Sequence, residues 1–365
     1  MAELIKHYFA CSNTAKGFQN YFASNLKDLD KIYILKGGPG TGKSSLMKKV
    51  GTLAVDKGLS VEYIHCSSDP DSLDGVIIPQ ISTAIVDGTS PHVIEPQAPG
   101  AIEEYVNLGI AWDVNALAAN KKQILYLENE ISACYPKAYD AFSKGLSIHD
   151  ELERIYIDQM DFDKANTLTD TVITTLLHTS YLPKKSIVKH RFFGGSTPKG
   201  SIDYVENLTN DLRSRYFIKG RAGSGKSTML KKILAAAQSR GYDVEVYHCG
   251  FDPDSLDMVL LPELSICIFD STAPHEYFPS KASDHVIDMY KELITPNTDE
   301  TYATEISDAT KRYKAAVKEG VSHLAYAKYL HDDLEKYYIA ATDFKKIDAL
   351  TEQLLQKINA QIDTL

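Results

Sequence analysis

Short apolar runs alternate with amphipathic stretches over the first hundred or so residues, a pattern typical of an α/β fold. Runs rich in aliphatic, aromatic and β-branched residues predict strands over 4–10, 32–35, 60–66 and 81–86. Apolar residues at helical spacing predict helices over 16–30 and 43–57, and Gly58 is placed to end the second of these. We expect a further short capped helix over 69–76, because the stretch opens with an Asp-Pro pair.

The character of the chain changes beyond about residue 100. Charged and apolar residues recur at helical intervals over 116–132, 137–158 and 162–178, and again from about 301 to 362. These segments predict helical hairpins appended to each α/β core. They either form a supporting layer or act as a lid or dimer surface, since amphipathic periodicity reports burial and not role.

The chain is a tandem duplication with an offset of 220 − 37 = 183 residues. Asp69-Pro70-Asp71-Ser72-Leu73-Asp74 returns as Asp252-Pro253-Asp254-Ser255-Leu256-Asp257, and the helical segment His149-Asp150-Glu151-Leu152-Glu153 resembles His331-Asp332-Asp333-Leu334-Glu335. We expect an α/β protein of two mainly parallel α/β/α cores in tandem, each with an appended helical region. The repeats span 1–183 (core about 1–100, helical region about 101–183) and 184–365 (core about 184–285, helical region about 286–365).

A glycine-rich loop follows the same predicted strand in both repeats and precedes a predicted helix. Both loops fit the pattern G-x-x-x-x-G-K-[ST], which cradles phosphate. Glycines let the backbone wrap closely around phosphate oxygens, and the N-terminus of the next helix attracts anions. The predicted nucleotide-binding residues are Gly37, Gly38, Pro39, Gly40, Thr41, Gly42, Lys43, Ser44 and Ser45, and Gly220, Arg221, Ala222, Gly223, Ser224, Gly225, Lys226, Ser227 and Thr228.

The lysines and serines of the two loops have distinct predicted roles. Lys43 and Lys226 are expected to reach the β- and γ-phosphates, and the hydroxyls of Ser44 and Ser227 are expected to bind Mg²⁺. The loops differ, because Arg221 and Ala222 replace Gly38 and Pro39. We therefore expect unequal affinities at the two sites.

An aspartate ends a predicted buried strand in each repeat, in Ile85-Val86-Asp87 and Ile268-Phe269-Asp270. Asp87 and Asp270 either bind the Mg²⁺ of a nucleotide or only cap the next turn. His92 and His275 lie five residues further on, where an imidazole acts as a catalytic base, contacts the γ-phosphate, or only satisfies a turn.

Two further polar groups are duplicated. His65, Cys66, Asp69, Asp71 and Asp74 follow a predicted strand and either line the ligand pocket or begin a helix; their spacing does not fit a closed zinc site. Lys16 and its twin Lys199 either meet a phosphate, of their own repeat or of the other one, or are solvated.

Bulk composition narrows the class of protein. Hydrophobic residues make up 44% of the 365, as in ordinary globular chains, and the net charge of −10 disfavours a nucleic-acid-coating role. Five scattered cysteines favour reduced thiols in the cytoplasm over a disulfide framework. The first residues lack the apolar core of a signal peptide, and no apolar run approaches the length of a membrane span.

These motifs resemble those of P-loop NTPases, with the two loops as Walker A motifs and Asp87 and Asp270 as Walker B aspartates. The pairing resembles an uncharacterised tandem-duplicated bacterial group labelled ATPase or nucleotide-kinase-like. The resemblance implies bound ATP and Mg²⁺, with ATP preferred to GTP because no NKxD-type guanine motif is placed as in GTPases.

The resemblance leaves three functions open. They are an ATPase that drives motion of the helical regions, a kinase of a small nucleotide-like molecule, and a nucleotide sensor whose helical regions bind a protein partner. Many related ATPases carry a glutamate soon after the Walker B strand to activate water. Here Gly88-Thr89-Ser90 and Ser271-Thr272-Ala273 follow instead, which slightly favours the sensor.

Overall fold

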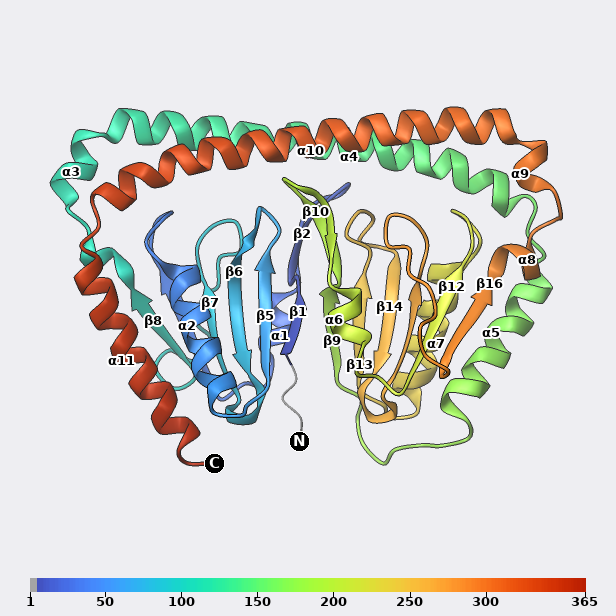
Figure 1. The fold of residues 1–365 in the computed structure, drawn as a ribbon, viewed down its shortest axis with the longest axis horizontal. Helices are drawn as coiled ribbons and strands as arrows, with labels where there is room; N and C mark the ends of the chain where they lie inside the picture. The colour runs from blue at the N-terminus through green and yellow to red at the C-terminus, as the bar shows by residue number, and fades with distance from the viewer. Residues whose placement is uncertain (1–4) are drawn as a thin grey trace.

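The computed structural model describes residues 5–365, and each repeat contributes a six-stranded mixed sheet flanked by helices (Figure 1). Residues 1–4, on which parts of the first strand prediction and of the signal-peptide analysis fall, lie outside the described residues. The strands of the first half are β1 (Ile5–Tyr8), β2 (Cys11–Thr14), β3 (Gly17–Asn20), β4 (Lys31–Lys36), β5 (Val61–Cys66), β6 (Asp69–Ile78), β7 (Thr83–Asp87) and β8 (Glu103–Asn107). Those of the second half are β9 (Val188–Phe192), β10 (Gly194–Thr197), β11 (Gly200–Asp203), β12 (Ser214–Lys219), β13 (Val244–His248), β14 (Leu256–Leu261), β15 (Ile266–Asp270) and β16 (Asp284–Asp288).

The two sheets have the same topology. Their strand orders are β1-β5-β6-β7-β4-β8 and β9-β13-β14-β15-β12-β16, and only β6 and β14 run antiparallel to their neighbours. β4 and β7 are adjacent and parallel, so the glycine loop after β4 and the aspartate at the end of β7 lie at the same edge of the sheet. Parallel sheets bind ligands at the carboxyl ends of their strands, which is where both features lie.

The helices flank the sheets or cross above them. Those of the first repeat are α1 (Phe22–Leu26), α2 (Lys43–Asp56), α3 (Val114–Ala119), α4 (Lys121–Ile157) and α5 (Phe162–Leu177), with short 3-10 turns at Pro79–Ile81 and Leu108–Ala111. Those of the second are α6 (Val205–Thr209), α7 (Lys226–Ser239), α8 (Met289–Leu293), α9 (Thr298–Thr301), α10 (Ala303–Ala340) and α11 (Phe344–Ile362), with a 3-10 turn at Pro262–Leu264. No helix within residues 5–365 combines the length and apolar character needed to cross a bilayer.

The strand–loop–helix unit predicted from the sequence is confirmed. The run 32–35 lies within β4, the expected helix 43–57 corresponds to α2, and Gly58 adopts φ of +77° just beyond it. A residue with a Cβ would be strained in that left-handed conformation, which explains the glycine.

The helix predicted over 16–30 is wrong. Residues 11–20 form the hairpin β2–β3, and only the short helix α1 follows. Thr14 donates its hydroxyl to the carbonyl of Gly17, and Gly17 takes φ of +90°, so local turn chemistry prevails over the apolar spacing.

The capped helix predicted over 69–76 is also wrong. These residues begin β6, which pairs with β5 and β7. In the second repeat Asp252–Ser255 forms a turn before β14, in which the Ser255 hydroxyl donates to Asp252. The aspartates therefore order a turn at the sheet edge, and the apolar run behind them is buried between two strands.

The helical regions are not hairpins on their own cores. The segments 116–132 and 137–158 were predicted as separate helices, but most of both belong to the continuous helix α4, which passes through Pro136. Proline removes one helical hydrogen bond. α4 packs along its length against α10, with apolar clusters on both sides of Pro136, and this packing keeps the helix intact.

The repeats exchange their last helices. α5 of the first repeat packs on α7 and α8 of the second, and α11 of the second repeat packs on α2 of the first (Figure 1). Ile347, Leu354 and Ile358 of α11 are buried in the first core, and Val172 and Leu176 of α5 are buried in the second. Each core is therefore completed by a helix from the other repeat.

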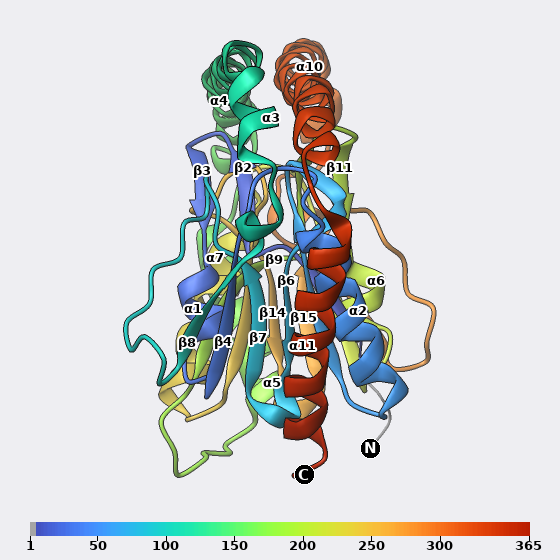
Figure 2. The same ribbon diagram turned by 90° about the vertical axis from the view of Figure 1, so that its left-hand side faces the viewer.

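The antiparallel pair α4–α10 spans both halves above the sheets, and the hairpins β2–β3 and β10–β11 reach up toward it (Figures 1 and 2). Below this helix pair, the edge strands β1 and β9 lie at the junction of the two halves. Phe9, directly after β1, and Phe192 of β9 exchange two backbone hydrogen bonds.

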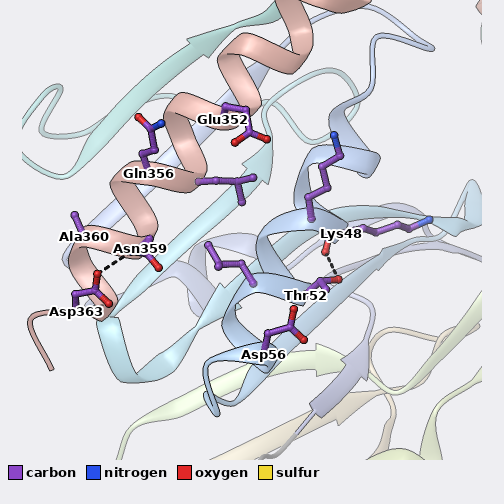
Figure 3. A pocket seen from close by; sticks show the side chains of 11 residues that line it. Lys48, Thr52, Asp56, Glu352, Gln356, Asn359, Ala360 and Asp363 are labelled. Atoms are coloured by element: carbon purple, nitrogen blue, oxygen red, sulfur yellow. Dashed lines mark hydrogen bonds between the residues drawn. The ribbon is translucent and has the colours of Figure 1, made fainter.

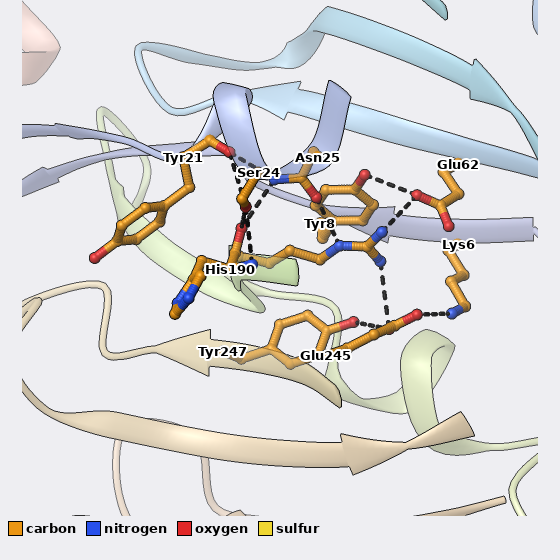
Figure 4. Close-up of polar contacts among 10 residues, drawn as sticks. Lys6, Tyr8, Tyr21, Ser24, Asn25, Glu62, His190, Glu245 and Tyr247 are labelled. Atoms are coloured by element: carbon orange, nitrogen blue, oxygen red, sulfur yellow. Dashed lines mark hydrogen bonds and ion pairs between the residues drawn. The ribbon is translucent and has the colours of Figure 1, made fainter. Parts of the chain in front are cut away.

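A buried ionic cluster lies at this junction (Figure 4). Arg191 is fully buried and pairs with Glu62 at 2.7 Å and with Glu245 at 3.3 Å, one carboxylate from each repeat. The guanidinium also lies 4.1 Å from the ring centroid of Tyr8. These contacts bind the halves to each other through charge as well as apolar packing.

Candidate nucleotide site

The first glycine loop joins β4 to α2 in a conformation that suits an anion. Gly40 and Gly42 adopt φ of +66° and +88°, and no side chain among the described residues caps the start of α2. The first N–H groups of a helix lack intrahelical partners and attract anions. Lys43 donates its ammonium group to the carbonyls of Gly37 and Gly38, both at 2.9 Å.

The second loop repeats this geometry. Gly223 and Gly225 adopt φ of +72° and +85°, and α7 likewise begins without a side-chain cap within residues 5–365. Lys226 donates to the carbonyl of Arg221 at 2.7 Å. Ser224 bonds the carbonyl three residues back, as Thr41 does in the first loop.

The aspartates at the strand ends serve two contacts at once. Oδ2 of Asp87 lies 3.5 Å from Nζ of Lys43, and the same distance separates Asp270 from Lys226. Oδ1 of Asp87 accepts hydrogen bonds from the backbone and hydroxyl of Thr89. The turn-capping role foreseen for this residue is present, and the other carboxylate oxygen still faces the lysine.

The loop serines contact β6 and β14, which are separated from β4 and β12 by one strand in each sheet. The hydroxyl oxygen of Ser44 accepts from the backbone N–H of Leu73 at 3.0 Å, and Ser227 accepts from Leu256 at the same distance. The residue after Leu73 is the buried Asp74, and the residue after Leu256 is the buried Asp257. Ser44 and Asp87 thus offer the oxygen ligands that Mg²⁺ prefers, and Ser227 and Asp270 offer the same set.

His92 is buried, and its Nε2 lies 3.2 Å from Oδ1 of Asp74. Burial alone would lower the pKa of His92, but the charges of Asp74 and Asp87 and the bond to Asp74 outweigh it and raise the pKa to about 9. The Nδ1 atom has no hydrogen-bond partner among the described residues. This geometry makes His92 a positively charged support for Asp74.

His275 turns to a different carboxylate. Its Nδ1 lies 2.6 Å from Asp203, which also accepts from the hydroxyl of Tyr277. Asp203 corresponds to Asn20 in the first repeat, so the carboxylate is missing there and His92 pairs with Asp74 instead. Without such a bond, Asp257 has a pKa raised to about 7 by burial and by the charge of Asp270.

Each loop is covered by the long helix of the other repeat. A Cβ placed on Gly38 would lie 2.7 Å from Cε1 of Tyr338, and one on Gly40 would lie 2.8 Å from Cγ1 of Ile339 and 3.3 Å from Cβ of Glu335. These three residues belong to α10. Glycine is therefore needed here for the approach of a helix as well as for the turn.

The second loop is covered in the same way by α4. A Cβ on Gly223 would lie 2.9 Å from Cα of Glu153 and would clash with its carbonyl oxygen. Arg221 pairs with Asp299 at 2.8 Å and lies 4.8 Å from the ring centroid of Tyr290. The two sites therefore share a plan but differ in the charge beside the loop.

The duplicated lysines upstream bridge the repeats. Lys16 contacts Asp252 at 2.9 Å and Asp254 at 2.5 Å, and Lys199 contacts Asp71 at 2.5 Å. Each hairpin tip is thus tied to the Asp-Pro-Asp turn of the other repeat. Both lysines are exposed, as the solvated alternative expected, and they form these ion pairs in addition.

A shallow groove of about 730 Å³ lies between α2 and α11 (Figure 3). Lys48, Lys49 and Asp56 line one side, and Glu352 and Asp363 line the other. These residues lie beyond the glycine loop along α2, so the groove is separate from the candidate phosphate site.

Sequence reasoning missed the coverage of each loop by the other repeat. A signal was available in the segment His149–Glu153, which is nearly repeated at His331–Glu335, and in Tyr156-Ile157, which returns as Tyr338-Ile339. Nothing in the sequence showed that these segments lie on the loops.

No protein-family model, no curated protein and no solved structure matches this chain. The chain's own geometry is therefore the basis for a proposal on function.

Proposed function

We propose that this protein binds two Mg²⁺·ATP molecules, one at each glycine loop, and hydrolyses them to drive movement of the α4–α10 pair. The observation that carries the proposal is the repeated geometry at the two loops. In each repeat an uncapped helix start, a loop lysine, a serine hydroxyl and a strand-end aspartate meet at one edge of the sheet.

Different residues of the chain would bind the phosphates and the metal. The backbone of residues 37–42 and the ammonium of Lys43 would hold the phosphates, while Ser44 and Asp87 would hold the metal. Mg²⁺ would neutralise charge between the β- and γ-phosphates. The lysine bonds to the loop carbonyls are what an incoming polyphosphate would replace.

Titration of a fluorescent ATP analogue in Mg²⁺ buffer tests the binding proposal. Lys43→Ala should retain only the second site and Lys226→Ala only the first. The two remaining affinities should differ, because Arg221 is present in only one loop and is paired with Asp299. Indistinguishable residual binding in the two variants would contradict the unequal sites.

A nucleotide sensor without turnover is the second candidate. It is favoured by the close contact of α10 with the first loop, because a bound nucleotide would have to meet that helix. Phosphate release by the wild type at the level of the Lys43→Ala/Lys226→Ala variant, with binding intact, would support the sensor over the ATPase. A kinase of a small nucleotide-like acceptor would instead release little phosphate until its acceptor is added.

A further inference from the structure

The two long helices place equivalent residues next to the two glycine loops. A Cβ on Gly40 would lie 3.3 Å from Cβ of Glu335 on α10, and a Cβ on Gly223, the twin of Gly40, would lie 2.9 Å from the backbone Cα of Glu153 on α4. Each glutamate has a histidine one turn earlier, with Nδ1 of His331 3.7 Å from Glu335 and Nδ1 of His149 3.7 Å from Glu153. This histidine–glutamate pair is repeated in the sequence, and in both halves the glutamate lies next to a glycine of the loop.

We propose that Glu335 activates the attacking water at the first loop and Glu153 does so at the second, each in trans from the repeat that does not contain the loop. This inference rests on the ATPase proposed above. The two glutamates would replace the water-activating glutamate that is absent directly after Asp87 and Asp270.

The strand-end aspartate and the nearby histidine of each half already have partners of their own. Asp87 bonds Thr89 and faces Lys43, and His92 is buried against Asp74. In the second half His275 is held by Asp203. The side chains of Glu335 and Glu153 are instead about one-third exposed, at 32% and 37%, so water reaches them beside the loop.

The proposed step is the hydrolysis of the bond between the β- and γ-phosphates of ATP. The glutamate carboxylate accepts a proton from water, the water oxygen bonds the γ-phosphorus, and the bond from that phosphorus to the β,γ-bridging oxygen breaks. ADP leaves with the bridging oxygen, inorganic phosphate is released, and the proton passes from the glutamate to solvent.

A crossed set of variants tests this assignment. Lys226→Ala leaves only the first site working, and Lys43→Ala leaves only the second. In the Lys226→Ala background, Glu335→Gln should lower phosphate release from ATP at least 100-fold, and Glu153→Gln should not. In the Lys43→Ala background the effects should be reversed. A loss of this size is typical of removing a general base.

Binding of the fluorescent ATP analogue is measured on the same proteins and should change less than about threefold, because the glutamates would act on water and not on the phosphate tail. Glu319→Gln on α10 and Asp140→Asn on α4 are matched controls, because both side chains are exposed on the same helices. They should leave both activities unchanged.

The opposite pairing, in which Glu335→Gln acts only on the second site, would overturn the trans assignment. Unchanged turnover in both glutamine variants would overturn it as well, and so would a wild type that binds nucleotide without releasing phosphate. A wild type that does not bind the analogue at all would instead remove the proposed function, and this inference with it.

Discussion

At the residue scale, the carboxylates beside the buried His92 should shift its pKa measurably. Its pKa is raised to about 9 because the carboxylates of Asp74 and Asp87 outweigh the cost of burial. In metal-free buffer, NMR of labelled histidine should show His92 titrating near pH 9. In Asp74→Asn the pKa should fall below its ordinary value, because burial remains while the main counter-charge is gone. Titration near 6.5 in both proteins would contradict the Asp74–His92 pair.

The same pair sets a pH dependence of stability. A histidine whose pKa is raised on folding adds stability that is fully present below its unfolded pKa of about 6.5 and is lost as pH rises through about 9. The shift of about 2.5 units corresponds to at most about 3 kcal/mol. Urea unfolding of the wild type and of His92→Gln should therefore differ most near pH 6 and least near pH 10. A difference that grows with pH would contradict this.

Individual residues of the candidate site were largely predictable from the sequence, because their chemistry is local. The loop glycines, Lys43 and Asp87 lie within one strand–loop–helix unit and its neighbouring strand, and the structure brings them together as expected. Glu335 and Tyr338 could not be predicted, because their approach to the loop depends on a helix that begins some 260 residues further along the chain.

The exchanged helices are the main feature at the scale of elements. α11 follows the second repeat in the sequence but buries Ile358 completely in the first core. Ile358→Ala should cost about 2–5 kcal/mol through lost apolar contacts and a cavity. Hydrogen exchange should then rise in α2 and β4 of the first core and remain unchanged in α7 and β12.

Leu176→Ala in α5 is the matched control. Leu176 belongs to the first repeat and is buried in the second core, so exchange should rise in α7 and β12 instead. If each substitution loosened the core of its own repeat, the exchange of helices would be wrong.

Errors of the sequence reasoning are also found at this scale. The hairpin β2–β3 carries helix-like apolar spacing, but its faces pack against the other repeat, as in the bond from the N–H of Ala15 to the carbonyl of Phe251. The strand β6 was mistaken for a helix because Asp-Pro begins turns and helices alike. In both cases long-range pairing, which a local pattern does not contain, decides the conformation.

A single buried cation links the halves at the scale of the whole molecule. Arg191→Ala would leave Glu62 and Glu245 buried near each other, with Lys6 still paired with Glu245 and with Glu62 left without an ion pair within residues 5–365. Loss of one member of a buried ionic cluster costs about 3–5 kcal/mol. Urea unfolding should show a loss of that size, whereas Arg312→Ala, which removes exposed pairs with Glu151 and Asp308, should cost under about 1 kcal/mol. Equal effects of the two substitutions would contradict a structural role for the buried cluster.

The two loops, 183 positions apart in sequence, are connected by α4 and α10, which each run from one half to the other loop. A nucleotide at either loop would contact a helix of the opposite repeat. Binding at one site should therefore change the nucleotide affinity of the other. This coupling requires that both loops bind nucleotide.

Calorimetric titration with Mg²⁺·ATP measures nucleotide binding at both loops. We expect two binding events for the wild type, one each for Lys43→Ala and Lys226→Ala, and none for the double variant. An absence of heat with the wild type, or heat retained in full by the double variant, would contradict this expectation.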